Sequence, residues 1–129
     1  MKDNGLDKNI WIKLIRYDHI KIDIEKAIEA VKKNEEDKID ALFFATNALS
    51  MEGLYRIHEL KLKVPEDIAL IGFDGHEAFD FFYSPLTYVK QPVDEMGKEA
   101  VRILLDQING SKKMSHIHLL PQLIIRDSS

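Results

Sequence analysis

The sequence has no cysteine, a single tryptophan and only four prolines in 129 residues. The absence of cysteine excludes disulfide bonds, iron–sulfur clusters and thiol catalysis within these residues, and it fits a reducing compartment. No window reaches the roughly 18 apolar residues of a membrane-spanning helix, so we expect no contact with a membrane. The formal net charge is −4, and no basic cluster indicates a surface that binds nucleic acid.

Motifs of common catalytic sites are also missing. The sequence has no P-loop, no GxGxxG turn, no GxSxG elbow and no HExxH zinc motif. His116 and His118 could place two imidazoles on one face of a strand, but no third ligand for a metal is evident. We therefore expect a protein that is not an enzyme and that has no catalytic residue, no metal site and no cofactor.

The most informative stretch runs from Val64 to Gly75. Its proline, Pro65, ends any preceding helix, and Ile68 to Phe73 then forms a nearly continuous apolar run. This pattern is typical of a strand buried on both faces in a parallel sheet. Asp74 follows directly, and ligands of open α/β sheets bind beyond the carboxyl ends of the strands. Asp74 is therefore the first candidate for a binding residue.

Strand and helix patterns alternate along the rest of the chain, which predicts an α/β fold with a parallel sheet flanked by helices. The composition, 45% hydrophobic and 31% charged, is that of an ordinary globular domain. The expected strands are Ile10 to Ile15, Ile39 to Ala45, Ile68 to Phe73 and Leu86 to Lys90, with an extended tail from Ile117 to Ile125. The expected helices are one capped by Asp23, one over 48–61 and one over 93–109, and a polar link covers 34–38.

Asn47 lies where the second strand gives way to a helix, as Asp74 lies at the end of its own strand. It is either an N-cap or turn residue or a binding residue. The helix over 48–61 is apolar beyond a single stripe, which indicates cover by its own sheet and by a further surface. The aromatic residues Phe79, Phe81 and Phe82 either pack on the flank of the domain or form a patch that a partner subunit covers.

Four blocks of the sequence resemble the LacI/GalR family of transcriptional regulators. ATNALSMEG at 45–53 resembles the family segment AND-x-MA-x-G, and VPEDIALIGFD at 64–74 resembles VPEDIAVVGFD. SPLTYVKQP at 84–92, followed by EMG, is similar to PPLTTVRQP and EMG, and the tail at 119–128 resembles LPPELVVRES. The third block favours regulators over periplasmic sugar-binding proteins of transporters, which remain the alternative.

The resemblance implies the C-terminal lobe of a periplasmic-binding-protein-like (type I) fold, in which a small-molecule effector lies between two lobes. The effector would be a sugar or a related polar molecule, and Asn47 and Asp74 would bind it; Ala48 replaces the aspartate usual in the family. The resemblance also implies a homodimer. Its contact would include Met51, Leu54, Tyr55, His58, Phe79, Phe81 and Phe82.

The resemblance further implies that the chain is part of a cytoplasmic regulator. Residues 1–91 and 117–129 would be an incomplete C-terminal lobe, and 92–110 would be a helix that packs in the N-terminal lobe of the full protein. Residues 1–5 resemble the end of a helix that begins upstream. Operator DNA would be bound only through the missing N-terminal domain. Without that lobe, we expect helix 93–109 to pack on its own domain, on a neighbouring chain or on nothing.

Overall fold

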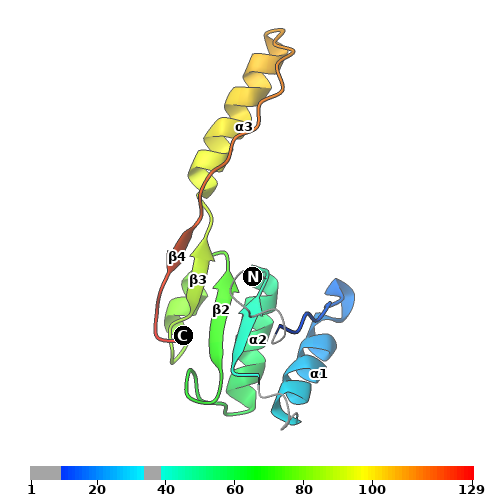
Figure 1. The fold of residues 1–129 in the computed structure, drawn as a ribbon, viewed down its shortest axis with the longest axis vertical. Coiled ribbons are helices and arrows are strands. Elements are labelled where there is room, and N and C mark those ends of the chain that lie inside the picture. The colour runs from blue at the N-terminus through cyan, green and yellow to red at the C-terminus, as the bar shows by residue number, and fades with distance from the viewer. Residues whose placement is uncertain (1–9, 34–38) are drawn as a thin grey trace.

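The computed structural model describes residues 10–33 and 39–129, which form a sheet, a pair of helices and a long projecting arm (Figure 1). The predicted polar link and the N-terminal helix end lie outside the described residues. The strands are β1 (Ala41–Phe44), β2 (Ala69–Phe73), β3 (Thr87–Lys90) and β4 (Gln122–Ile124). The helices are α1 (Ile20–Lys33), α2 (Asn47–Glu59) and α3 (Val93–Ile108), with short 3-10 helices η3 (Tyr17–His19) and η4 (Glu77–Phe81).

The strands lie side by side in their order along the chain, β1-β2-β3-β4. The first three are parallel, with Ala41 opposite Ala69 and Ile71 opposite Thr87. The fourth is antiparallel to β3, because the chain reaches it on the way back from the arm. The sheet is therefore mixed, and the expectation of a parallel sheet holds for β1 to β3 only.

Helix α2 packs on β1 and β2, and α1 packs on α2. The approach of α2 to the sheet depends on Gly53: a Cβ atom there would lie 2.3 Å from Cζ of the Phe44 ring, a distance that no packed side chain tolerates. The buried residues of α1 are Ile24 and Ile28. The buried core is Ile24, Ile28, Phe44, Leu54, Ile57, Val64, Ile68, Leu70, Phe79 and Leu86.

The prediction that β2 is buried on both faces was wrong. Leu70 is fully buried toward α2, but Ile71 and Phe73 on the opposite face are half-buried. Beside them Phe43 is 57% exposed, and its ring meets that of Phe73 edge to face. Within the described residues no helix covers this second face, so the apolar run is buried on one side only.

The predicted strand at Ile10 to Ile15 is not formed. These residues pair with no strand of the described sheet, and Trp11 and Leu14 are 64% and 87% exposed. Apolar and β-branched residues favour a strand only where a neighbour supplies backbone hydrogen bonds.

The prediction of Asp23 as a helix cap was also wrong, because α1 begins at Ile20 and Asp23 lies within its first turn. The Asp23 carboxylate instead accepts hydrogen bonds from Nε and Nη2 of Arg16, each at 3.0 Å, and from the Arg16 backbone N–H. These contacts lower the pKa of Asp23 to about 2, since the guanidinium favours the ionised carboxylate.

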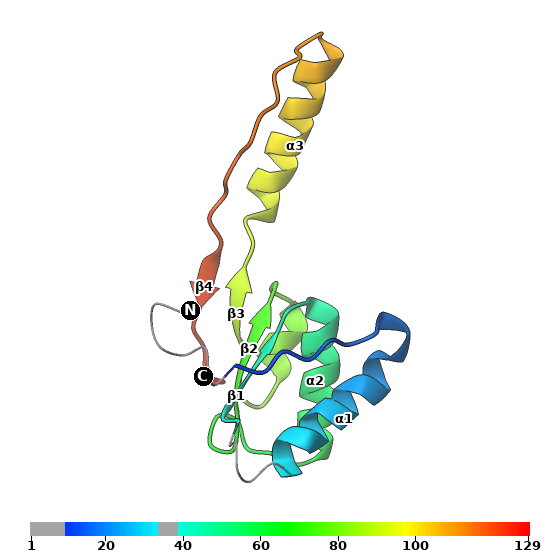
Figure 2. The ribbon, with the colours of Figure 1, turned by 45° about the vertical axis from the view of Figure 1, so that its right-hand side comes forward.

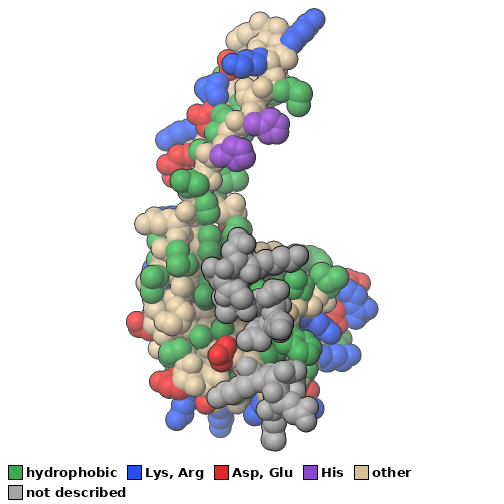
Figure 3. Space-filling view, viewed as in Figure 1, with side chains coloured by type: hydrophobic (Ala, Val, Ile, Leu, Met, Phe, Trp, Pro, Cys, Tyr) green, Lys and Arg blue, Asp and Glu red, His purple; other side chains and the backbone are tan. Residues whose placement is uncertain are grey.

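Helix α3 and the returning segment 109–121, together called the arm, run side by side and project away from the sheet (Figures 1 and 2). No residue of α3 is buried. Hydrophobic side chains lie open along the arm (Figure 3). The apolar stripe of α3, every residue of which is exposed, consists of Val93, Met96, Gly97, Ala100, Val101, Leu104, Leu105 and Ile108. In the described chain the stripe therefore has no packing partner.

The C-terminal tail closes the amino ends of β2 and β3 through Ser128, which is fully buried. The Ser128 Oγ donates to the Leu70 carbonyl at 2.6 Å and accepts from the Thr87 N–H at 2.8 Å. Its backbone carbonyl accepts from the Leu70 N–H, and its N–H donates to the Pro85 carbonyl. The tail thus supplies hydrogen bonds at the amino ends of β2 and β3, next to the first pair of their ladder, Ile71 with Thr87.

Substitution Ser128→Ala should lower the free energy of unfolding by about 2 kcal/mol, because it leaves a buried carbonyl and a buried N–H without a side-chain partner. Urea unfolding followed by circular dichroism measures this difference. Ser115→Ala is the matched control, because Ser115 is exposed in the arm. Equal unfolding midpoints for the two variants would show that the Ser128 hydroxyl does not hold the strands together.

Candidate functional site

The carboxyl ends of β1 and β2 meet at one edge of the sheet, here called the carboxyl edge. The strands are parallel and neighbouring, with Phe44 opposite Gly72, so the residues that follow them leave the sheet at the same place. Asn47 is the first residue of α2, and Asp74 directly follows β2. The two candidate binding residues from the sequence therefore lie at the same edge, and both are half-buried.

Asn47 is not the N-cap of α2. That position belongs to Thr46, whose Oγ1 accepts a hydrogen bond from the Leu49 N–H at 3.2 Å. The hydroxyl of Ser50 donates back to the Thr46 carbonyl, so this first turn is complete without the Asn47 side chain. Within the described part of the chain, the Asn47 amide makes no hydrogen bond and remains available to a ligand.

Asp74 is held in an uncommon backbone conformation, with φ at +68°. Aspartate is among the few residues that adopt this left-handed region readily. Its N–H donates to the Val89 carbonyl at 3.0 Å, which extends the contact between β2 and β3 by one residue. The carboxylate Oδ1 accepts a hydrogen bond from Nε2 of Gln91. Among the described residues Oδ2 has no partner, so one oxygen is fixed and the other is free.

Gln91 is the residue of this edge that sequence reasoning missed. It follows β3, the third parallel strand, and is half-buried beside Asp74. In the sequence it reads only as part of a Gln-Pro pair that stops a strand. The criterion that selects Asn47 and Asp74, a polar side chain just beyond a parallel strand, selects Gln91 equally well.

The chemistry at the carboxyl edge is that of hydrogen bonding. A carboxylate only accepts hydrogen bonds, whereas an amide both donates and accepts them, which suits a ligand with neighbouring hydroxyls. His76 caps η4, with its Nδ1 accepting from the Ala78 N–H at 3.0 Å. Across the described residues, no three His, Asp or Glu side chains are grouped to hold a metal ion, and no helix there has the length and apolarity to cross a membrane.

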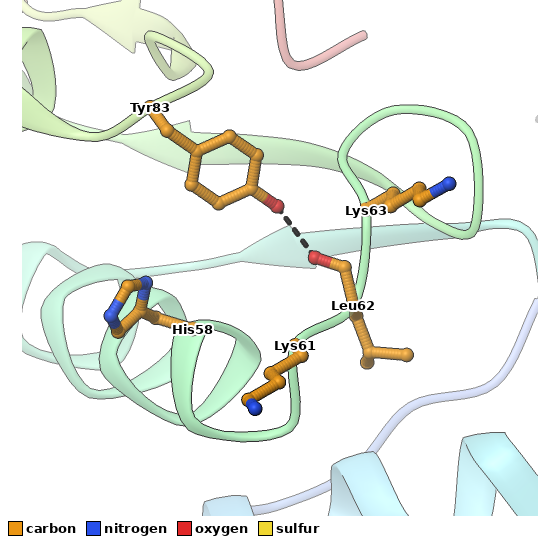
Figure 4. Close-up of a pocket in the computed structure, with 5 residues that line it drawn as sticks. All are labelled: His58, Lys61, Leu62, Lys63 and Tyr83. Carbon is orange, nitrogen blue, oxygen red and sulfur yellow. Dashed lines mark hydrogen bonds between the residues drawn. The ribbon is translucent and has the colours of Figure 1, made fainter.

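Two hollows lie elsewhere, along α2 and the segment 78–83. The larger, of about 430 Å³, is lined by Met51, Leu54, Tyr55, His58, Ala78, Phe81, Phe82 and Tyr83. The smaller, of about 260 Å³, adjoins it at His58 and Tyr83 (Figure 4), where the Tyr83 hydroxyl donates to the Leu62 carbonyl. Partial burial raises the pKa of Tyr83. We call the lining of the larger hollow the α2–η4 surface.

The aromatic segment divides between the core and this surface. Phe79 is 1% exposed and packs edge to face on Tyr88, so for Phe79 the flank of its own domain is the correct alternative. Phe81 is 88% exposed. Leu54 is 6% exposed and belongs to the core, whereas Tyr55 on the outer side of α2 is 60% exposed. Leu54 and Phe79 therefore have almost no surface for a partner subunit.

Comparison with known proteins places the chain in a family. The model of the periplasmic binding protein-like domain matches residues 7–129. The HTH-type transcriptional repressor MelR of Bacillus subtilis is 38% identical over 89 residues, which are 69% of this chain and 26% of MelR. The chain thus spans about a quarter of the length of that relative.

Solved structures agree with this assignment. A LacI-family transcription repressor from Corynebacterium glutamicum matches with a TM-score of 0.73 and 31% identity, over 84% of this chain and 41% of that one. A LacI-family regulator from Lactobacillus casei with bound glucose matches with a TM-score of 0.65 and 25% identity, over 84% and 39%. The fold and family expected from the sequence are thereby confirmed: the chain belongs to the periplasmic binding protein-like domain family, among the effector domains of LacI/GalR regulators.

Proposed function

We propose that this chain forms the effector-binding C-terminal lobe and the dimerisation surface of a cytoplasmic LacI/GalR-type regulator, and that it has no enzymatic activity. The observation that carries this proposal is the pair Asn47 and Asp74 at the carboxyl edge, each half-buried and each with polar atoms that have no partner among the described residues. The effector is a sugar or a related molecule with several hydroxyls. The glucose bound to the Lactobacillus casei relative supports this class of ligand.

Binding at this edge would use Asp74 as the main acceptor. Its free Oδ2 accepts a hydrogen bond from one ligand hydroxyl, and the Asn47 amide bonds to a neighbouring one. A hydrogen bond to a charged group contributes about 1.5–3 kcal/mol, so the carboxylate supplies the larger share. The open carboxyl edge forms one side of such a site, and a second lobe outside the described residues forms the other.

The arm supports the same division into lobes. We assign residues 1–91 and 117–129 to the C-terminal lobe and 92–110 to a helix that packs in the N-terminal lobe. The exposed stripe on α3 includes Leu104 at 56% and Ile108 at 70% exposure, and burial of each such side chain is worth about 1.5–3 kcal/mol. An effector held between the lobes shifts the population of their closed arrangement, which changes the affinity for operator DNA bound by another part of the protein.

The α2–η4 surface is the contact that we assign to a second copy of the chain. Met51, Tyr55, Phe81 and Tyr83 on it are between 39% and 88% exposed, and a hydrophobic patch with this aromatic content is typical of subunit contacts. His58 and Phe82 line the same hollow.

Substitution Asp74→Asn in the full-length protein should weaken sugar binding by about tenfold or more, because it removes the charge from the main acceptor. Asparagine keeps the tolerance for the left-handed backbone. The measurement is the rise in melting temperature with increasing D-glucose and related mono- and disaccharides. Asp40→Asn, the same change at an exposed position before β1, should have no effect. If the two variants bind equally well, Asp74 is not in the site, and if no sugar raises the melting temperature, the ligand class is wrong.

Substitution of Tyr55 or Phe81 by glutamate should convert a dimer into a monomer, because it buries a charge in an apolar contact. Sedimentation velocity of the protein at micromolar concentration measures the change. Tyr17→Glu is the control, since Tyr17 is 85% exposed and lies outside the α2–η4 surface. A wild-type monomer, or Tyr55 and Phe81 variants that sediment as the wild-type dimer, would overturn the assignment of this surface.

A further inference from the structure

We propose that Gln91 is a positioning residue of the effector site and that it couples the Asp74 carboxylate to the base of the arm. The inference rests on the proposed function of Asp74, which it deepens. The observation behind it is the hydrogen bond from Gln91 Nε2 to Asp74 Oδ1, which joins the residue after β3 to the residue after β2.

The Asp74 carboxylate has few other constraints. Its backbone is fixed by the left-handed φ and by the bond from its N–H to the Val89 carbonyl. Its side chain is held, among the described residues, by Gln91 alone. A carboxylate that is already oriented loses less conformational freedom when a ligand binds. The amide of Gln91 therefore prepares Oδ2 for a ligand hydroxyl.

Gln91 also lies at the base of the arm. The last pair of the sheet at this end is Lys90 with Gln122. Beyond this pair one side of the chain continues as Gln91 and then Pro92, the N-cap of α3, and the other side is Pro121. Pro121 and Pro92 have no N–H to donate, and the hydrogen-bonded ladder ends at Lys90 and Gln122. The arm joins the sheet through these two segments (Figure 2).

The hydrogen bond from Gln91 to Asp74 connects the base of the arm, here called the junction, to the carboxyl edge. It leaves Oδ2 open, so a ligand hydroxyl and the Gln91 amide can hold the same carboxylate at once. Each then favours the other: an ordered junction improves ligand binding, and a bound ligand stabilises the junction. This reciprocity follows from linkage, and it gives an effector a direct route to the segment that carries α3.

The first test needs no ligand. The chain has no cysteine, so Lys26→Cys on α1 and Lys112→Cys near the tip of the arm place two nitroxide labels at exposed positions. Pulsed electron–electron double resonance then measures the distance between the two nitroxides. An excess of unlabelled chain is present so that only pairs of labels within one chain contribute. Gln91→Ala should broaden the distribution of distances. Gln91→Glu should broaden it further, because two carboxylates repel each other.

Gln122→Ala is the matched control. It removes a glutamine from β4, the strand that pairs with β3, and it leaves Asp74 and Gln91 in contact. It should give the wild-type distribution. Circular dichroism melting shows whether each variant is folded. Folded Gln91 variants with the wild-type distribution would overturn the proposal that this amide orders the base of the arm.

The second test uses D-glucose and the other sugars on the full-length protein. Gln91→Ala should weaken binding about tenfold, with Gln122→Ala unchanged. If Asp74→Asn weakens binding and Gln91→Ala does not, the positioning role fails while the proposed function stands. If neither residue affects binding, the assignment of the site itself fails. Whatever the binding result, the distances between the nitroxide labels show whether Gln91 orders the base of the arm.

Discussion

The parallel, in-register pairing of β1 with β2 is the constraint on which the rest of the structure depends. It makes the chain leave both strands at one edge, so that Asn47 and Asp74 come together from distant parts of the sequence. The pairing is supported on one side by α2, which approaches β1 closely because residue 53 is glycine. At the opposite end of the sheet, buried Ser128 bonds to both β2 and β3. The site is therefore a consequence of sheet geometry.

Much of the fold follows from local pattern. Helix α3 matches its predicted range because its apolar stripe repeats at helical spacing and Gly110, with φ at +92°, ends it. Strands β1 and β2 follow from apolar runs bounded by turn residues, and β3 follows from the alternating run from Leu86 to Lys90. The errors concern tertiary partners. Within residues 10–33 and 39–129, residues 10–15 have the composition of a strand but no neighbouring strand, and Phe43 lies on a sheet face that no helix covers. No local pattern specifies which surfaces meet.

At the site, too, some features follow from the local sequence and others depend on tertiary contacts. Asn47 and Asp74 could be identified from their positions after two strands, and the resemblance to LacI/GalR regulators added their role. The N-cap role of Thr46 could have been anticipated, since threonine favours that position, and it removes the structural explanation for Asn47. The contact of Gln91 with Asp74 could not, because it depends on the register of β3 against β2 and on the backbone conformation of Asp74. The burial of Phe79 likewise depends on how η4 folds back on Tyr88.

We infer that the carboxyl edge of β1, β2 and β3 forms one side of a ligand site. The most direct measurement is an amide ¹H–¹⁵N spectrum of the full-length protein, recorded during titration with a sugar that raises its melting temperature. We predict that the largest shifts in this chain fall at Asn47, Asp74 and Gln91, whose groups lie at that edge. Shifts confined to the hollow beside His58 and Tyr83 would contradict it.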